Sequence, residues 1–281
     1  MHKLLNAGIG DTGQYTDIIP ETILGRYWEY AQPNLVLRGL AAYNIPSAEI
    51  KGSDIDIPIQ TSATISINTV AEAAEIPFEL QSMTTRNLRP LKYGDAFHVS
   101  TEAIEDAQFS VIDMNSKASA ERMAANEEYL IATLLGSNAG NTVSDNTNVD
   151  IDNLRAAKRN LTTNDFKATD LILSPQLVND LEGIDTYVEA DKSGISNPSM
   201  GLMGKISGMN VWEASTLINE SSKYTGYVID RDNAFVIGEK RPLKMEMKDN
   251  PQYDRKEYYF TMRTAFAYLH ANAICQIDIT P

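Results

Sequence analysis

The sequence predicts an α+β fold in which a long extended ribbon, one long helix and a compact mixed region follow one another. Three observations support this prediction. Residues 53–69, SDIDIPIQTSATISINT, alternate between an apolar or small residue and a mostly polar one, which is the period of a strand with one apolar face. Residues 110–135 carry apolar residues at helical spacing, and the chain after residue 223 returns to strand-like runs.

Composition limits the classes of protein and partner. The chain has 281 residues, 43% of them hydrophobic, so it can form one large domain or two modest ones with a packed core. Its formal net charge of −14 argues against a broad electrostatic grip on nucleic acid or an anionic membrane. Cys275 lies in the alternating run NAICQIDI, which predicts a buried thiol. With no signal peptide or membrane span in the sequence, we expect a soluble protein made in the cytoplasm.

The first 47 residues are expected to form an N-terminal arm and a short helix. Residues 1–18 contain the turn-forming run GIGDTG and no periodicity, which is typical of an extended arm. Residues 18–33, IIPETILGRYWEYAQP, predict a helix because Pro20 lies near its first position and Pro33 follows its last turn.

Residues 48–100 are expected to form an extended loop of two long antiparallel strands around a tip near residues 70–76. As one strand, residues 54–68 would span roughly 50 Å, about the diameter of a compact chain of this length. Either this strand breaks at Pro58 or around residues 61–62 and forms an ordinary hairpin, or it projects and buries its isoleucines on another chain. The periodicity alone leaves both alternatives open.

A long spine helix is expected next. Between Ser110 and Leu135 two adjoining apolar stripes run at helical spacing, and one of them passes through Met114 and Tyr129. So wide an apolar arc implies packing on more than one side of the helix. Gly136 is expected to cap its end.

The polar run GSNAGNTVSDNTNVD separates this elongated part from a compact one. There, Asp150 or Asp152 is expected to cap a helix, DLILS to form a buried strand, and SPQLVNDLEG to form a helix from Ser174 to Gly183. The run GLMGKISG lacks the spacing of a phosphate loop and is expected to be a flexible loop. Strands are expected at the sequences YTGYVID, NAFVIG, LKMEM, KEYYFTMRTAFAYL and NAICQIDI.

No residue pattern indicates an active site. The three histidines, His2, His98 and His270, lack the spacing of two metal ligands on one helical face. SDNTNVDID has neither the central glycine nor the final glutamate of a calcium loop, so a helix cap and an exposed strand edge explain its aspartates. Nucleophile elbows, CxxC pairs and dinucleotide motifs are absent. We therefore expect no catalytic residue, no cofactor and no metal.

The order of these elements resembles the major capsid protein of tailed bacteriophages and related archaeal viruses, the Hong Kong 97 fold. The resemblance covers nearly the whole chain. Its most telling stretch begins at AEAAEIPFEL, which looks like that family's loop tip, and continues through the return strand at AFHVS to a helix ending in ATLLG. DLILSPQLVNDLEG, GLMGKISGMNVWEAS and YVIDRDNAFVIG fall where the family's axial-domain helix, its loop near the capsomer axis and its following strands are expected.

The resemblance divides the chain into five expected parts. They are an N-terminal arm with a short helix (1–47), an extended β-hairpin loop (48–100), the spine helix of a peripheral domain (101–146), an axial domain (147–235) and closing strands shared between the two domains (236–281).

The same resemblance implies a coat protein that assembles with itself, as hexamers and pentamers, into an icosahedral-type shell around viral double-stranded DNA. The extended loop would lie across a neighbouring subunit, which makes five residues candidates for burial between chains: Ile65, Ile67, Val70, Ile76 and Phe78. Further expected partners are a portal, a separate scaffolding protein and loosely held DNA, with no membrane. The implied location is the virion capsid, after assembly in the host cytoplasm.

Some members of that family join subunits through an isopeptide from a lysine near the loop tip. Here no Lys or Arg occurs from Ser53 to Thr85, and Lys51 and Lys92 lie at the base of the loop. We therefore expect a shell without such crosslinks.

Two alternatives remain open from the sequence. An encapsulin-type nanocompartment would use the same fold to close a shell around cargo enzymes. More remotely, the chain is a soluble enzyme or binding protein with an unrecognised site.

Overall fold

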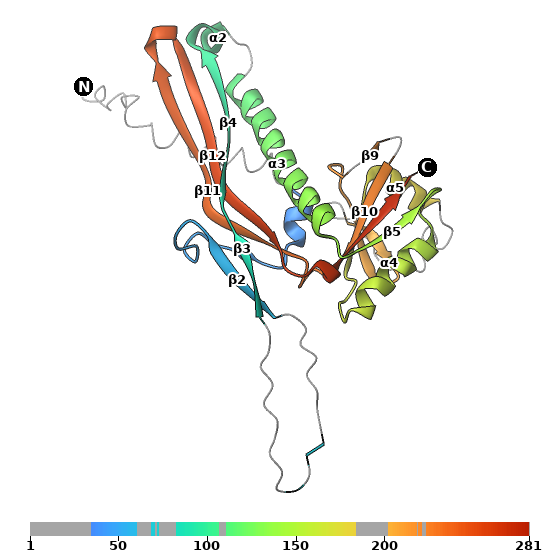
Figure 1. Ribbon diagram of the computed structural model, residues 1–281. Coiled ribbons are helices and arrows are strands. Elements are labelled where there is room, and N and C mark those ends of the chain that lie inside the picture. Colours follow the sequence, from blue (N-terminus) through green and yellow to red (C-terminus); the bar gives the residue numbers. More distant parts are fainter. Residues whose placement is uncertain are drawn as a thin grey trace, which may run out of the picture.

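The computed structural model describes most of the chain. The described residues are 35–60, 69–70, 72, 83–106, 111–183, 202–217, 219–220 and 223–280. The arm and the short helix expected before residue 34 lie outside this range. Figure 1 shows an elongated region of long strands beside a single long helix, and a compact region of sheet and helices next to the lower end of that helix.

Three long strands and one short one form the elongated sheet, in the order β1-β11-β12-β4. They are β1 (Asn44–Ile45), β11 (Phe235–Asn250), β12 (Arg255–Tyr268) and β4 (Leu91–Ser100). The runs NAFVIG and LKMEM, expected as two strands, form the single strand β11, whose pairing with β12 shifts register twice between Glu239 and Lys244. The short 3-10 helix η4 (Pro251–Tyr253) connects β11 to β12 at the far end.

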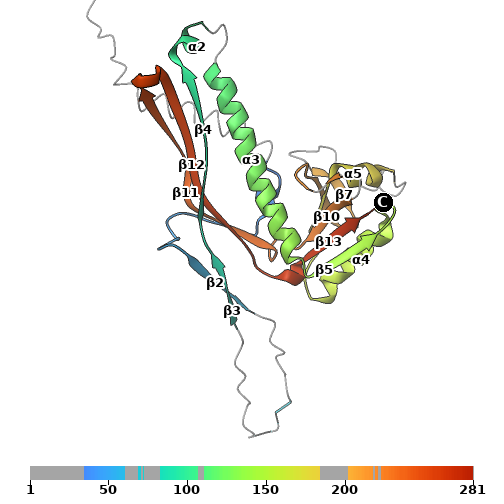
Figure 2. The same ribbon diagram turned by 45° about the horizontal axis from the view of Figure 1, so that its top comes forward.

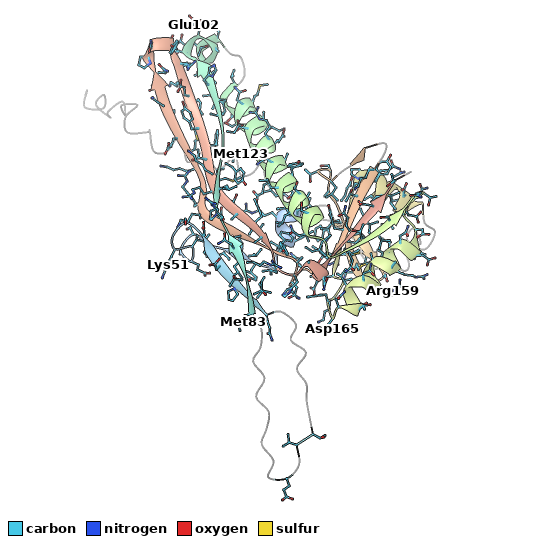
Figure 3. The ribbon with its side chains drawn as sticks, viewed as in Figure 1. Lys51, Met83, Glu102, Met123, Arg159 and Asp165 are labelled. Carbon is cyan, nitrogen blue, oxygen red and sulfur yellow. The ribbon has the colours of Figure 1, made fainter. Side chains whose placement is uncertain are left out.

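The spine helix α3 (Val111–Asn138) runs alongside β4 and β12, as Figures 1 and 2 both show. It follows the short acidic helix α2 (Thr101–Asp106). Met123, labelled in Figure 3, lies in a core cluster with Tyr258 and Phe260 of β12. α3 therefore buries one of its faces against the middle of the sheet.

Two details of the expected helix are wrong. Met114 and Tyr129, placed on its buried stripe, are 66% and 60% exposed, because the face that packs on the sheet runs through Ala120, Met123 and Ala124. Gly136 does not end the helix, which continues to Asn138.

Gly136 has a packing role instead. A Cβ atom at this position would lie 2.8 Å from the Tyr227 hydroxyl oxygen of the compact region. Only glycine therefore allows this close approach of helix and tyrosine.

The compact region is built on a second sheet, with strand order β5-β13-β10-β6-β8-β7 and β9 paired to β10. Its strands are β5 (Asn141–Asp145), β6 (Asp170–Leu173), β7 (Leu202–Ile206), β8 (Met209–Glu213), β9 (Asn219–Glu220), β10 (Lys223–Ile229) and β13 (Ile274–Ile279). Helices α4 (Ile151–Thr163) and α5 (Pro175–Glu182) pack against the sheet. The central strand β6 is buried at all four positions, as the run DLILS predicts.

Local signals in this region behave as expected. Asp150 caps α4, since its Oδ1 accepts a hydrogen bond from the backbone N–H of Asn153 at 2.8 Å. Ser174 occupies the N-cap position of α5, as expected, but its side chain makes no capping hydrogen bond, and Gly183 follows the helix. Cys275 is fully buried, and burial raises the pKa of its thiol.

The prediction of a flexible loop at GLMGKISG is wrong for the described residues of this run. Residues Leu202–Ile206 form β7, which pairs antiparallel with β8. Ser207 and Gly208, both at positive φ, make the tight turn between them. The turn-forming residues Ser207 and Gly208 at the end of this run made the whole run look like a loop, although a strand precedes them.

Candidate assembly surfaces

The extended ribbon begins as a regular two-stranded sheet. β2 (Ile55–Gln60) pairs antiparallel with β3 (Met83–Leu88), and Pro58 lies opposite Thr85 in the middle of this pairing. A break at Pro58 is therefore wrong. Proline is tolerated because β2 pairs on one edge alone within the described residues. The alternative break at residues 61–62 lies outside the described residues.

The returning arm divides between two sheets. Its first part, β3, pairs with the outgoing arm as expected, whereas the following strand, β4, pairs with β12 in the elongated sheet. The ribbon is thus joined covalently to the edge strand of that sheet, which fixes the direction in which it leaves the body.

The apolar residues at the base of the ribbon pack against this chain's own core. Ile57 and Ile59 are 8% and 7% exposed and pack, with Leu88, in one cluster. The other members of that cluster from the elongated sheet are Ile45, Val236, Ala265 and Ala267, and Leu269 follows the end of β12. Each buried isoleucine or leucine contributes about 1.5 to 3 kcal/mol before the ordering entropy of the chain is subtracted.

Gly238 of β11 allows the ribbon to approach the elongated sheet closely. A Cβ atom at Gly238 of β11 would overlap the Leu88 side chain and would lie 3.4 Å from Ile50 Cδ1. The base of the ribbon therefore sits directly on the backbone of β11.

The five residues expected to contact neighbouring subunits lie beyond this base. Ile65, Ile67, Ile76 and Phe78 are outside the described residues. Val70 is described and is 42% exposed, with no described core cluster around it.

Residues ahead of the ribbon are anchored to the spine helix by two carboxylates that the sequence reading missed. Glu128 accepts the backbone N–H groups of Leu37 at 2.9 Å and of Arg38 at 3.2 Å. Glu127 accepts two hydrogen bonds from Arg38 Nη1, at 2.8 and 3.0 Å. These contacts hold the 3-10 helix η3 (Leu37–Leu40) against α3.

Burial shapes the titration of both groups. It raises the pKa of Glu128 to about 7, although the two backbone donors oppose the shift. It also raises the pKa of Glu127, against the effect of the neighbouring Arg38 guanidinium. Both glutamates lie on the same helical face as Met123 and Ile131, where the sequence alone gives no sign of them because glutamate is ordinarily exposed.

The far end of the long hairpin carries exposed aromatic residues around a fixed carboxylate. Glu257 accepts hydrogen bonds from Tyr259 Oη at 2.5 Å, from Arg255 Nε at 2.9 Å and from Asn250 Nδ2 at 3.0 Å. These donors hold its pKa down at about 2. Arg255 also lies over the ring of Tyr253, which is 61% exposed.

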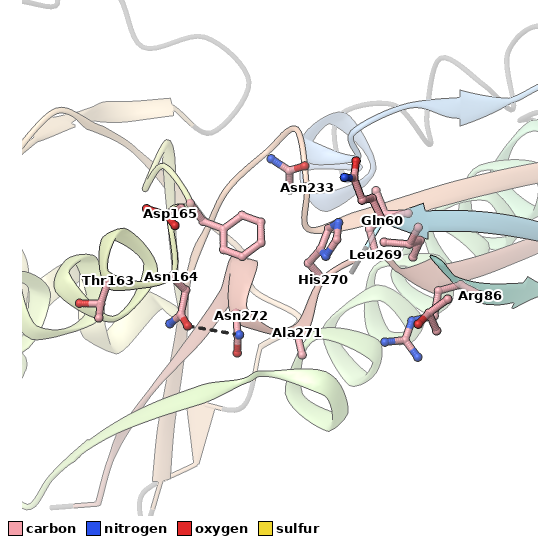
Figure 4. A pocket seen from close by; sticks show the side chains of 13 residues that line it. Gln60, Arg86, Thr163, Asn164, Asp165, Asn233, Leu269, His270, Ala271 and Asn272 are labelled. Carbon is pink, nitrogen blue, oxygen red and sulfur yellow. Dashed lines mark hydrogen bonds between the residues drawn. The ribbon is translucent and has the colours of Figure 1, made fainter. Parts of the chain in front are cut away.

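A cavity of about 780 Å³ separates the ribbon base from the compact region. Figure 4 shows Gln60 and Arg86 of the ribbon on one side, Asn164 and Asp165 on the other and His270 between them. Burial and the nearby Arg86 lower the pKa of His270. Across the described part of the chain, no three His, Cys, Asp or Glu side chains come together as a metal site.

The described helices include none that is long and apolar enough to cross a membrane.

Comparisons with known proteins identify the family. Residues 15–279 match the phage capsid family. None of the curated proteins matches the chain in sequence.

Solved capsids share the fold at low sequence identity. The capsid of cyanophage P-SCSP1u is 12% identical, with a TM-score of 0.69 and 88% of each chain covered. The mature capsid of bacteriophage PhiM1 is 11% identical, with a TM-score of 0.67, 88% of this chain and 87% of that chain covered. The capsid of the native GTA particle is 12% identical, with a TM-score of 0.65, 88% of this chain and 91% of that chain covered.

These comparisons do not specifically support the encapsulin-type alternative, and the family points to a structural rather than an enzymatic protein. The fold expected from the order of elements is confirmed. This chain belongs to the phage capsid family and is a major capsid protein, a shell subunit with the Hong Kong 97 fold.

Proposed function

We propose that the chain forms hexamers and pentamers of an icosahedral-type shell around viral double-stranded DNA, and that its extended loop is the main arm between subunits. The ribbon base supports this proposal. Ile57 and Ile59 of the ribbon base are buried in the chain's own core. The same apolar alternation continues in the sequence beyond them, as far as Ile67. The continuing apolar face requires a partner.

The five loop residues Ile65, Ile67, Val70, Ile76 and Phe78 are the proposed contacts to neighbouring subunits. Each burial adds a modest free energy, and a closed shell multiplies it because every subunit is held by several neighbours at once. A misplaced subunit with fewer contacts leaves more easily, which favours error correction during assembly.

Charge supports the proposed cargo. A net charge of −14 keeps densely packed DNA from adhering to the shell wall, so the DNA is held loosely and leaves when required. We further propose a separate scaffolding protein and a portal, assembly in the host cytoplasm, and the same division into arm, loop, peripheral domain and axial domain that the sequence suggests.

The test is electron microscopy of the purified chain, expressed alone and with the proteins encoded next to it. Uniform hollow polyhedra are expected for the wild type. Replacing Ile65 and Ile67 together by serine should prevent closed shells while leaving the folded subunit intact. The matched control replaces Met114 and Tyr129, which are exposed on the spine helix, by serine.

Two results contradict the proposal. The first is a chain that stays monomeric under all assembly conditions. The second is a loop variant that closes shells as well as the control does. Denaturing gels of wild-type shells should show single subunits, since the loop from residue 53 to residue 85 contains no lysine.

A further inference from the structure

The face of the ribbon base that packs on the core carries one charged side chain. In the β2–β3 ladder Arg86 lies directly opposite Ile57, which is buried in one cluster with Leu88. Residues opposite each other in a ladder share a face, so Arg86 leaves the ribbon on its apolar side. A guanidinium therefore occupies a position that its neighbours on this face fill with apolar side chains.

The described residues give this guanidinium no counterion. Arg86 Cζ lies over the ring of Tyr268, 4.1 Å from the ring centroid. Its Nε atom is buried and has no hydrogen-bond partner, and no acidic side chain of the described residues forms an ion pair with it. A charge that is partly removed from water costs free energy unless hydrogen bonds or an opposite charge compensate it. An anion beside Arg86 would supply that compensation.

Arg86 lines the cavity of about 780 Å³ between the ribbon base and the compact region. Figure 4 shows Arg86 on one side of this cavity and Asp165 on the other. Asp165 is the one carboxylate among the described lining residues, and it is exposed to solvent. The volume lies in the range of pockets for small molecules. Both sides belong to the same chain, so the cavity forms without a second subunit.

His270 provides a second hydrogen-bond donor in the same cavity. Its ring packs against that of Phe166, with the centroids 5.4 Å apart. Burial and the charge of Arg86 lower the pKa of His270, and Asp230 partly opposes the shift. The Asp230 carboxylate already accepts a hydrogen bond from Asn233 Nδ2 at 3.0 Å. The imidazole therefore lies within the electrostatic reach of Arg86, where a bound anion would affect both groups.

We propose that this cavity binds a small oxyanion, the phosphate or carboxylate group of a small molecule, on the forked donors of Arg86 with the His270 ring beside it. Guanidinium N–H groups match two oxygens of such a group at once. Other lining residues carry amide and hydroxyl groups, which suit the polar remainder of the ligand; they are Gln60, Thr84 and Asn164. The ligand contacts both the ribbon base and the compact region.

The test uses sulfate as the probe, because it has the oxygen geometry of phosphate and does not titrate near neutral pH. The chain contains three histidines, so few imidazole signals appear in NMR spectra of the unassembled full-length chain, and His270→Asn identifies the signal of His270. Sulfate added at constant ionic strength should shift that signal to saturation and leave the signal of His98 unchanged. The concentration at half-saturation gives the Kd.

Substitutions of Arg86 should weaken this binding. Arg86→Gln removes both the charge and the forked donors and should raise the Kd for sulfate by at least about tenfold. Arg86→Lys keeps the charge without the fork and should raise it less. The matched control is Arg89→Gln, which changes the net charge equally at a side chain that is 76% exposed, and it should bind sulfate like the wild type. Thermal unfolding verifies that each chain is folded.

The pH dependence distinguishes a ligand site from a purely structural role of Arg86. The charged groups around His270 are Arg86 on the ribbon and, on the compact side, Asp165 and Asp230. A bound anion favours the protonated imidazole, so sulfate should bind more tightly as the pH falls through the titration of His270. His270→Asn should lose this dependence while still binding sulfate at alkaline pH.

Competition identifies the kind of anion. Inorganic phosphate and acetate are each added to the sulfate-bound chain. Stronger displacement by phosphate supports a phosphorylated ligand, and stronger displacement by acetate supports a carboxylate.

Three results overturn the oxyanion site. One is the lack of a saturable shift of His270, and another is an Arg86→Gln chain that binds sulfate as tightly as the wild type. The third is binding to the unassembled chain that is lost in assembled shells, because a neighbouring subunit then fills the cavity. If the wild type forms no shells, the proposed function fails, whereas the measurements on the unassembled chain still decide this site.

Discussion

The compact region and the elongated region bury their strands in different ways. In the compact sheet, β6 is buried at every position and β10 at its last five, so both faces of the central strands are covered within one chain. In the elongated sheet, β11 is buried at its first four positions, alternates between buried and exposed residues from Leu243 to Glu246, and has no buried residue beyond Glu246. The described residues of the compact region therefore cover both faces of its central strands, whereas the elongated sheet keeps exposed positions toward its far end.

The largest expected effect tests this difference directly, by truncating one leucine in each region to alanine. Leu173→Ala in β6 should lower the free energy of unfolding of the unassembled chain by about 3 kcal/mol, because a fully buried leucine leaves a cavity. Leu91→Ala in β4 should change it by less than about 0.5 kcal/mol, since Leu91 is 54% exposed. Urea unfolding measures both. Equal losses would show that the elongated region is as closed in the monomer as the compact one.

A second test concerns the anchor between η3 and the spine helix. The pKa of Glu128 is about 7 in the folded chain, above its value of 4.5 when exposed. A raised folded pKa gives stability that is present below pH 4.5 and is lost as the pH rises through 7. Unfolding of the wild type should therefore become easier between pH 5 and pH 8, by on the order of 2 kcal/mol from this group.

Glu128→Gln should remove that part of the pH dependence, since glutamine does not titrate and keeps an oxygen acceptor for the backbone donors. Thermal unfolding across this pH range is the measurement. Glu121→Gln, an exposed residue of the same helix, is the control and should leave the slope unchanged. A slope that persists in Glu128→Gln would assign it to Glu127 or to groups elsewhere.

The contact of the ribbon base with β11 is tested at Gly238. Gly238→Ala should destabilise the chain by about 2 kcal/mol, because its Cβ atom overlaps Leu88. Combined with Leu88→Ala, the loss should be smaller than the sum of the two single losses by at least about 0.5 kcal/mol. Gly39→Ala is the control, since no atom lies within 4 Å of the added Cβ. Additive losses would mean that the ribbon base is not packed on β11.

The smallest expected effect is at the junction of the two regions. Gly136→Ala should destabilise by about 1 kcal/mol, because the clash with the Tyr227 hydroxyl exceeds the gain in helix propensity. Adding Tyr227→Phe removes the clashing oxygen and should restore wild-type stability or exceed it. Unfolding of the two single variants and the double variant measures the coupling. A Gly136→Ala chain more stable than the wild type would show that helix and strand are not tightly joined here.

Structural features that depend only on residues close in the sequence could be predicted from it. Asp150 and Ser174 mark helix starts through local backbone geometry, and the period-two face of β2 follows from the strand itself. The order of elements then sufficed to predict the capsid fold.

Features that depend on distant partners were not readable. Glu127 and Glu128 are buried because Arg38 and Leu37, about ninety residues earlier, supply their donors. Gly136 looks like a helix end until Tyr227 is placed beside it. The cluster of cations on the elongated sheet is another example, since Lys92 and Arg241 become neighbours of Arg263 only when three strands pair.

The two register irregularities of β11, between Glu239 and Lys244, separate the part of the strand that belongs to the central core from the part that reaches the far end. Extra residues in a strand permit bending there. The two extra residues allow β11 to change direction between the core cluster of Phe235 and that of Met245, so one continuous strand joins two separately packed parts of the molecule.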